Sequence, residues 1–241
     1  MAKKSLFIIT GCSSGIGLAL SSKLIENKEN CVLGIARNCP FEAENFIFKS
    51  LDLAKIDLVK EIKFPDIEEG YDAIHLINNA GMLGEINTLD KIGLESLEDV
   101  ISVNYTSAML LCTKFIQKYQ HLPVAKTIIN ISSGAATGAY ASWSNYCASK
   151  AALEMLSKCI EIEQKDKASP IHCFSIAPGV VNTNMQNQIR STPIENFTLL
   201  PKFEELHREN KLYSPAIVAD KLIEVLQNPK RFMEKVFRIQ I

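Results

Sequence analysis

Short apolar runs recur along the chain, and none of them strictly alternates apolar with polar residues. The runs are SLFIIT at 5–10, CVLGIA at 31–36, NFIFKS at 45–50, AIHLIN at 73–78, TIINIS at 127–132 and IHCFSI at 171–176. A strand with one exposed face alternates, whereas a strand that helices cover on both faces is apolar throughout. The pattern therefore predicts a parallel sheet that is buried between two layers of helices.

Stretches long enough for helices separate these runs. The predicted helices cover Ile16–Asn27, Leu94–Tyr119 and Asn145–Gln164. Strands that alternate with helices imply right-handed crossovers, and so an α/β, doubly wound (Rossmann) sheet. The length of 241 residues suits a single domain, residues 1–241, because no internal repeat or low-complexity linker divides the chain. Segment 182–215, rich in Asn, Thr and Pro, is predicted to leave the sheet and to act as a substrate lid.

The composition argues against several classes of partner. The net charge is −1, which predicts no nucleic-acid and no membrane partner. Seven scattered cysteines without a Cys-x-x-Cys pair predict free thiols, no metal site and a reducing, cytoplasmic compartment. The first apolar run is too short for a secretory signal, and no apolar stretch approaches the ~18 residues of a membrane span. The basic residues near the end are interrupted by apolar ones and predict a solvated face, at Lys230, Arg231, Lys235 and Arg238.

The segment TGCSSGIG, residues 10–17, joins the first predicted strand to the first helix. Glycine tolerates positive φ and lets the backbone approach a pyrophosphate, which then lies against the N–H groups of the helix N-terminus. Glycine clusters also occur in purely structural turns, but the position between a strand and a helix favours phosphate binding. We expect a dinucleotide to bind at Gly11, Ser13, Ser14, Gly15, Ile16 and Gly17.

The second strand ends in GIARN, which places Arg37 and Asn38 where the ribose of a dinucleotide would lie. An NAD site places an Asp or Glu there to bind the ribose 2′-hydroxyl, whereas a guanidinium pairs with a 2′-phosphate. The sequence therefore favours NADP(H) as the cofactor, although Arg37 could also be a surface arginine that caps a loop. Asp52 and Leu53, which follow the third strand, are expected beside the adenine.

Further motifs follow the glycine turn: NNAG at 78–81, Asn104, ISSG at 131–134, the pair Tyr146 and Lys150, and PGVVNT at 178–183. In their order and spacing these motifs resemble those of the short-chain dehydrogenases/reductases, and the resemblance covers nearly the whole chain. It implies a seven-stranded parallel sheet and hydride transfer between a nicotinamide and an alcohol or carbonyl carbon. It also implies a homodimer that pairs through the two long predicted helices.

The same resemblance assigns roles to individual residues. Tyr146 resembles the catalytic acid/base, Lys150 its partner, and Ser133 the serine that holds the substrate carbonyl. Asn104 matches the family asparagine, which we expect to anchor a water that returns protons to the lysine. The remaining matches are to cofactor contacts, at Asn79, Ala80, Gly81, Tyr146, Lys150, Pro178, Gly179, Val181 and Thr183.

The chemistry explains why a tyrosine and a lysine four residues apart are needed. An unperturbed tyrosine has a pKa of about 10, so it ionises little at neutral pH. Lys150 lies one helical turn after Tyr146 on the same helix face, where its charge favours the phenolate. Lowering the tyrosine pKa by ~3 units requires about 4 kcal/mol of such stabilisation. The hydroxyl of Ser133 can hold the substrate oxygen where negative charge develops.

The segments around Tyr146 and after Pro178 resemble most closely the sepiapterin reductase-like branch of the family, and within it the bacterial benzil reductases. This resemblance implies NADPH-dependent reduction of a small ketone or vicinal dicarbonyl, often an aromatic one. The expected substrate contacts are Ser133, Tyr140, Trp143 and Tyr146. Phe197 and Phe203 are candidates for the same apolar pocket or for ordinary core packing.

Three alternatives remain open. A sepiapterin or other pteridine reductase would hold the pteridine with an aspartate near the C-terminus, where this chain has Arg238 and no acidic residue after Glu234. A 3-oxoacyl-carrier-protein reductase shares the chemistry but would need a basic docking patch that the sequence does not display. A non-catalytic, NADP-binding redox sensor usually lacks the tyrosine or the lysine, and this chain has both.

Overall fold

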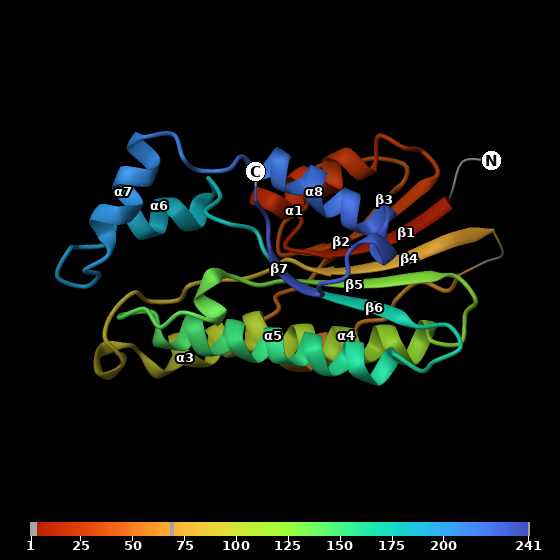
Figure 1. Cartoon of the computed structure of the whole chain (residues 1–241), viewed down its shortest axis with the longest axis horizontal. Coiled ribbons are helices and arrows are strands. Elements are labelled where there is room, and N and C mark those ends of the chain that lie inside the picture. Colours follow the sequence, from red (N-terminus) through yellow and green to blue (C-terminus); the bar gives the residue numbers. More distant parts are fainter. Residues whose placement is uncertain (1–3, 68–69, 241) are drawn as a thin grey trace.

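A single parallel sheet organises the computed structural model, which describes residues 4–67 and 70–240. Its seven strands lie in the order β3-β2-β1-β4-β5-β6-β7 (Figure 1). Their bounds are Lys4–Thr10 (β1), Asn30–Ala36 (β2), Phe46–Ser50 (β3), Tyr71–Asn78 (β4), Ala125–Ile131 (β5), Ile171–Ala177 (β6) and Val236–Arg238 (β7). The predicted α/β class and seven-stranded parallel sheet are confirmed, and every predicted apolar run forms a strand.

The apolar runs are continuous because successive residues of a strand enter different cores. In β1, Phe7 and Ile9 pack into the cluster on one face of the sheet, whereas Leu6 and Ile8 pack into the cluster on the other face. All four side chains are buried. Each Å² of apolar surface removed from water stabilises the fold by roughly 25 cal/mol, so packing on both faces contributes to the stability of the sheet. The double coverage leaves the strand ends as the accessible parts of the central strands, whereas the edge strand β3 exposes side chains along its length.

Helices cover both faces of the sheet. Those longer than one turn are α1 (Gly15–Leu24), α2 (Ile56–Glu61), α3 (Leu94–Ile101), α4 (Ser107–Tyr119), α5 (Ser144–Gln164), α6 (Asn184–Arg190), α7 (Leu200–Arg208) and α8 (Pro215–Gln227). In Figure 1, α1 and α8 lie above the sheet, and α3, α4 and α5 lie below it. Among the described residues, no helix is long and apolar enough to cross a membrane.

The expected helix Leu94–Tyr119 is not one regular α-helix. It is divided into α3 and α4 by a π-helical segment, Ser102–Thr106, whose buried residue is Asn104. A π-helical segment widens the turn and so changes the direction in which side chains point. Apolar periodicity predicted the whole helical stretch but could not detect this local change. The first helix also ends earlier than expected, at Leu24 instead of Asn27.

Segment 182–215 is more regular than its composition suggested. It contains α6 and α7, which lie beyond the end of the sheet to the left in Figure 1. Phe197, between the two helices, is fully buried and stacks on Trp143, with ring centroids 4.9 Å apart. Aromatic packing therefore holds this segment against the start of α5.

Candidate active site

One cavity of about 810 Å³ lies where the loops that follow the strands meet. In open α/β sheets, ligands bind at the carboxyl ends of the strands. The predicted site residues that line the cavity are Gly11, Ser13, Ser14, Gly15, Ile16, Arg37, Asp52, Leu53, Asn79, Ala80, Gly81, Ser133, Tyr140, Trp143, Tyr146, Lys150, Pro178, Gly179, Val181 and Thr183. The remaining three, Gly17, Asn38 and Asn104, do not line it.

The glycine turn has the shape that a phosphate site requires. Gly11 and Gly15 have φ of 68° and 54°, in the region that favours glycine. A Cβ on Gly17 would lie 2.2 Å from the carbonyl oxygen of Gly11, so Gly17 serves the close packing of the turn on α1. The N-cap residue Ser14 makes no side-chain capping bond. The first N–H groups of α1 are therefore available to an anion, and this end of the cavity fits a dinucleotide diphosphate.

Thr10 ties the glycine turn to the NNAG motif. Its hydroxyl oxygen accepts hydrogen bonds from the backbone N–H groups of Asn79 and Ala80, each at 3.0 Å. The Asn79 amide in turn donates to the carbonyl oxygens of Thr10, at 2.9 Å, and Gly11, at 3.2 Å. The sequence motifs predicted Asn79 as a cofactor contact but did not identify Thr10 as a residue that supports the site. The spacing of the motifs shows only that both lie at strand ends.

Tyr146 and Lys150 lie on α5 and face the cavity wall formed by the end of β5. The Lys150 ammonium is 5.9 Å from the centre of the Tyr146 ring and donates a 2.8 Å hydrogen bond to the Ile131 carbonyl oxygen. The Ser133 hydroxyl lies close enough to the Tyr146 side chain to lower the pKa of the tyrosine. The structure thus brings together the three residues that the sequence singled out as a catalytic set.

Burial changes the protonation of both residues. It raises the pKa of Tyr146, against the opposite effect of the hydrogen bond from Ser133. Burial also lowers the pKa of Lys150 from 10.5 to about 8. The sequence led us to expect a lowered tyrosine pKa, but in the protein by itself the cost of burying a phenolate is larger than the stabilisation by its neighbours.

Asn104 lies behind this set, not on the cavity wall. Its side-chain oxygen accepts from the Met82 N–H at 2.8 Å, and its amide donates to the Met82 carbonyl at 2.9 Å. The amide also donates to the Ser149 hydroxyl at 3.0 Å. These bonds join α5 to the loop after β4. They use both amide hydrogens of Asn104, and the water that we expected this residue to anchor stays a prediction.

An aromatic cluster lies next to Tyr146. The Trp143 ring is 5.8 Å from that of Tyr146, centre to centre, and 5.4 Å from that of Phe203 on α7. Tyr140 lies 5.5 Å from Trp143. Further residues of segment 182–215 line the cavity here and were not predicted as site residues; these are Asn184, Met185, Gln186, Gln188 and Ile189 of α6, and Leu206 of α7. In the sequence, only their position within segment 182–215 associated these residues with the cavity.

Charged residues line both ends of the cavity. Arg37 is exposed at the wall next to Asp52, whereas Asn38 lies outside the cavity. Lys202, Lys211 and Arg238 line the cavity as well. The prediction that Arg238 belongs to a solvated face is therefore incomplete, because its exposed side chain faces the same cavity as Tyr146.

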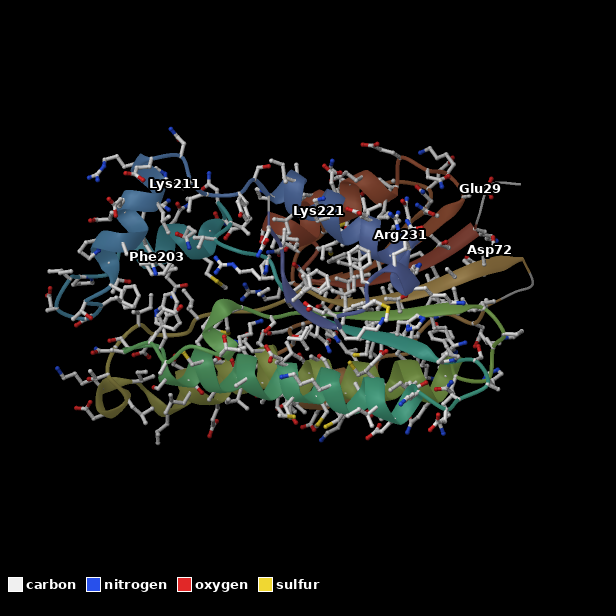
Figure 2. All side chains as sticks on the ribbon, viewed as in Figure 1. Glu29, Asp72, Phe203, Lys211, Lys221 and Arg231 are labelled. Carbon is white, nitrogen blue, oxygen red and sulfur yellow. The ribbon has the colours of Figure 1, made fainter. Side chains whose placement is uncertain are left out.

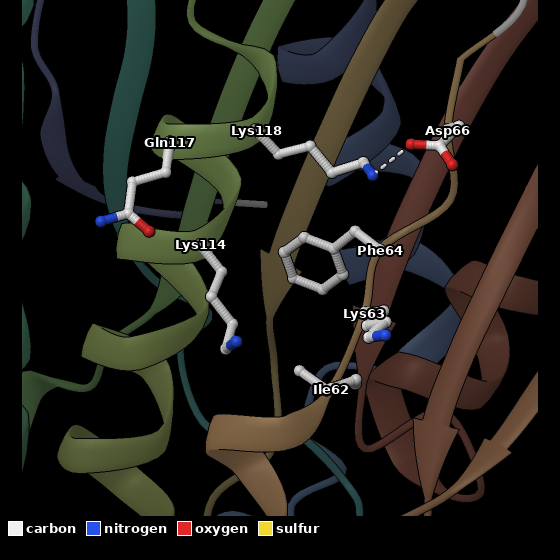
Figure 3. Close-up of a pocket in the computed structure, with 7 residues that line it drawn as sticks. All are labelled: Ile62, Lys63, Phe64, Asp66, Lys114, Gln117 and Lys118. Atoms are coloured by element: carbon white, nitrogen blue, oxygen red, sulfur yellow. Dashed lines mark hydrogen bonds and ion pairs between the residues drawn. The ribbon is translucent and has the colours of Figure 1, made fainter.

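A second cavity, of about 360 Å³, lies between α4 and the segment after α2. Figure 3 shows its lining, Ile62, Lys63, Phe64, Asp66, Lys114, Gln117 and Lys118. It shares no lining residue with the large cavity, and Lys118 is already paired with Asp66. Among the described residues, no cluster of His, Cys, Asp and Glu could hold a metal, and all seven cysteines are free. The large cavity is therefore the candidate active site.

Known proteins resemble the chain in both sequence and fold. The model of the short chain dehydrogenase family matches residues 5–194. A benzil reductase that forms (S)-benzoin, from Bacillus cereus, is 36% identical over 96% of this chain and 98% of its own length. A sepiapterin reductase from Bos taurus is 32% identical over 67% of this chain and 60% of its own length.

Solved structures share the architecture. A short-chain dehydrogenase/reductase from Saccharomyces cerevisiae superposes with a TM-score of 0.83 at 22% identity, over 98% of this chain and 95% of the other. At 22% identity, that similarity shows the fold alone. The family model and the sequence relatives show the family. The chain belongs to the short-chain dehydrogenase/reductase family of nicotinamide-dependent oxidoreductases.

Proposed function

We propose that this enzyme is an NADPH-dependent carbonyl reductase for a small ketone or vicinal dicarbonyl that bears an aromatic group. The observation that carries the proposal is that Ser133, Tyr146 and Lys150 line one cavity, with the aromatic cluster around Trp143 beside Tyr146. The benzil reductases of Bacillus cereus and Bacillus subtilis, 36% and 34% identical to this chain, support an aromatic dicarbonyl as substrate.

In this proposal, the bound nicotinamide supplies the hydride. The Tyr146 hydroxyl donates a proton to the carbonyl oxygen as that oxygen becomes negative. The Ser133 hydroxyl hydrogen-bonds to the same oxygen and holds it within reach of the tyrosine. The buried Lys150 ammonium favours the phenolate that is left behind, because an opposite charge is strongly felt where water is excluded.

Asn104 acts in this proposal as a positioning residue. Its side chain holds the Met82 backbone and the Ser149 hydroxyl, so it fixes the distance between the loop after β4 and α5. Residue 81 is a glycine at a point where these groups come close together. A Cβ there would lie 3.2 Å from the Lys150 nitrogen and 3.4 Å from the Asn104 oxygen. Asn104 therefore keeps Lys150 close to the cofactor side of the cavity.

The proposed cofactor contacts follow the cavity from one sheet edge towards the other. Arg37, with Asn38 beside it, would bind the 2′-phosphate, and Asp52 and Leu53 would flank the adenine. The N-terminus of α1 would hold the diphosphate, with Ser13, Ser14 and Ile16 at its start. The nicotinamide end would be held by residues from the loops after β4 and β6, which are Asn79, Ala80, Gly81, Pro178, Gly179, Val181 and Thr183.

Pteridine reduction is the main competing function, because sepiapterin reductases are among the relatives. A pteridine presents N–H donors that a carboxylate accepts. The carboxylates that line the cavity are Asp52, after β3, and Asp99, on α3, and neither belongs to the lid segment or to β7. Arg238 lines the cavity at β7 instead, and a guanidinium cannot accept these bonds. The arrangement therefore favours a ketone over a pteridine.

We also propose that the chain is a single domain whose segment 182–215 closes over the substrate, and that two copies pair through α4 and α5. The outer face of α5 exposes Met155 at 58% and Ile162 at 74%. Apolar side chains on the free face of a long helix are typical of a protein interface. A cytoplasmic location remains a prediction from the sequence.

The first test removes the proton donor. Tyr146→Phe is expected to lower kcat for benzil with NADPH by about 10²–10⁴-fold, since the phenyl ring has no proton to donate. The affinity for NADPH, measured by equilibrium titration, should stay within a factor of three of wild type. Tyr140→Phe is the matched control and should remain active. A Tyr146→Phe enzyme with wild-type turnover would refute the assigned role.

The second test concerns the buried charge. Lys150→Met should abolish turnover, yet raise the Tm of the cofactor-free protein at pH 7 by several degrees. The folded-state pKa of about 8 lies below the unfolded value of 10.5, so the folded state binds the proton more weakly. Burying the charged lysine therefore costs roughly 3 kcal/mol below pH 8, and this cost disappears as the pH rises from 8 to 10.5.

Thermal unfolding of wild type and Lys150→Met at pH 7 and at pH 10 measures this difference. The advantage of the variant should be large at pH 7 and should fall to about a quarter of that value at pH 10. If Lys150→Met were less stable than wild type by the same amount at both pH values, the lysine would be a net structural contact and not a destabilising buried charge.

Arg37 provides the test of cofactor choice. Arg37→Gln should weaken NADPH binding about tenfold to hundredfold, because one charge-assisted hydrogen-bonding partner of the 2′-phosphate is lost. NADH lacks that phosphate and serves as the internal control, so its dissociation constant should not change. Fluorescence titration with both cofactors measures the two constants. Equal affinity of the wild-type enzyme for NADPH and NADH would rule out NADP specificity.

The proposed dimer is tested by placing a charge on α5. Ile162→Asp should shift the protein from dimer to monomer in sedimentation velocity, since the carboxylate would be buried against the partner copy. Ile194→Asp, at a position that is 52% exposed in segment 182–215, is the matched control and should leave the dimer intact. A wild-type chain that sediments as a monomer would disprove the pairing.

A further inference from the structure

The charges that line the large cavity are divided unevenly. Its two carboxylates, Asp52 and Asp99, come from the loop after β3 and from α3. In Figure 1, α3 lies below the sheet, whereas the lid helices α6 and α7 lie above it at the left. The lid segment and the end of β7 contribute three cations, Lys202, Lys211 and Arg238, and no carboxylate. The wall that the lid segment and β7 form is therefore positively charged.

The strand order places Arg238 too far away to serve the phosphates of the cofactor. Five inter-strand steps separate β2, which carries Arg37 at its end, from β7, which ends at Arg238. At about 4.8 Å a step, the two strand ends are roughly 24 Å apart. The end of β1, where the diphosphate would bind, is four steps or about 19 Å from β7, whereas β5, which precedes Ser133, is only two steps or about 10 Å away.

Lys202 belongs to the same end of the cavity. It precedes Phe203 on α7, and the Phe203 ring lies 5.4 Å from Trp143, which in turn lies 5.8 Å from Tyr146. Figure 2 shows Phe203 and Lys211 together at this end of the molecule, far from Arg231. Lys211 already has an ion pair with Glu209 at 2.6 Å. Among the described residues, by contrast, neither Lys202 nor Arg238 has an ion-pair or hydrogen-bond partner for its side chain.

We propose that the substrate is an aryl ketone that carries a carboxylate, and that Arg238 and Lys202 bind this carboxylate while Ser133 and Tyr146 bind the ketone oxygen. This inference rests on the proposed carbonyl reductase activity. An arginine fork matches a carboxylate with two parallel hydrogen bonds, and a nearby lysine adds a point charge. The cations also attract an anionic substrate towards the cavity, and salt weakens that attraction. The substrate class therefore includes aromatic oxo acids as well as neutral diketones.

The test compares acids with their uncharged methyl esters. The two pairs are phenylglyoxylate and 4-oxo-4-phenylbutanoate, each with its methyl ester, so that the carboxylate lies at two distances from the ketone. In the double variant Lys202→Gln/Arg238→Gln, the ratio of kcat/KM for acid over ester should fall about tenfold to hundredfold in at least one pair, as expected for losing hydrogen bonds to a charged group. The kcat/KM for the esters should change less than threefold.

Binding gives a second readout that does not need turnover. Trp143 is the only tryptophan of the chain and lines the cavity, so its fluorescence reports the occupancy of the site. Titration of the NADP⁺-loaded Tyr146→Phe enzyme with each acid should give a dissociation constant that rises tenfold or more when both cations are removed. The constant should also rise with ionic strength. Arg231→Gln, which removes the same charge outside the cavity, is the matched control and should change nothing.

The outcomes separate the two proposals. If wild type reduces benzil or the esters but the acid-to-ester ratio is the same with and without the two cations in both pairs, the carbonyl reductase proposal stands and the carboxylate proposal is wrong. The double variant could instead lose turnover of acids and esters alike, together with an equal loss of NADPH affinity. That result would assign the two cations to the cofactor and would also overturn the inference. Absence of turnover on every carbonyl, with normal NADPH binding, would instead refute the reductase function.

Discussion

Coverage of both faces of the sheet by helices governs where chemistry can occur in this molecule. Neighbouring residues such as Ile8 and Ile9 are both buried because they enter opposite cores, so the interior of each central strand is occupied by apolar packing. Polar groups that must reach a ligand are left to the loops at the strand ends. Because the sheet is parallel, the carboxyl ends of all seven strands lie at the same side, and the residues after them share one cavity.

The same burial accounts for the electrostatics of the site. Lys150 is only 3% exposed and Tyr146 only 6% exposed, and removal from water disfavours the charged form of each. This placement destabilises the protein, but it leaves a cation and an acid in surroundings where each interacts strongly with a developing charge. The aromatic cluster formed by Trp143, Phe197 and Phe203 contributes by closing one side of the cavity. Stability and reactivity therefore oppose each other at the same residues.

Much of the architecture could be predicted because it depends on local patterns. The six apolar runs became strands whose bounds lie within two residues of those expected, and α5 ends at Gln164 as expected. The final strand, Val236–Arg238, was not located, because a run of three residues carries no periodicity. The π-helical segment around Asn104 was missed for a related reason, since one wider turn does not disturb the apolar pattern of a long helix.

The site was predictable only in part. Sequence motifs identified Tyr146, Lys150 and Ser133 as a set, and the structure joins them around the end of β5. The same motifs could not distinguish residues that line the cavity from residues that support it, so Gly17 and Asn104 were grouped with the former. They also gave no sign that Thr10 would bind the backbone after β4, about seventy residues later.

The sequence by itself determined the fold class and the family and predicted the reacting residues, because each is encoded by short motifs and by the period of apolar residues. Only the tertiary structure decided which distant side chains share the cavity. Arg238 belongs to an interrupted basic stretch of the sequence, and only the structure shows that it lines the cavity of Tyr146 together with Lys202 of α7. The physical reason is that periodicity reports the neighbours of a residue along its own helix or strand, whereas a binding cavity is formed by the packing of elements that are far apart in the chain.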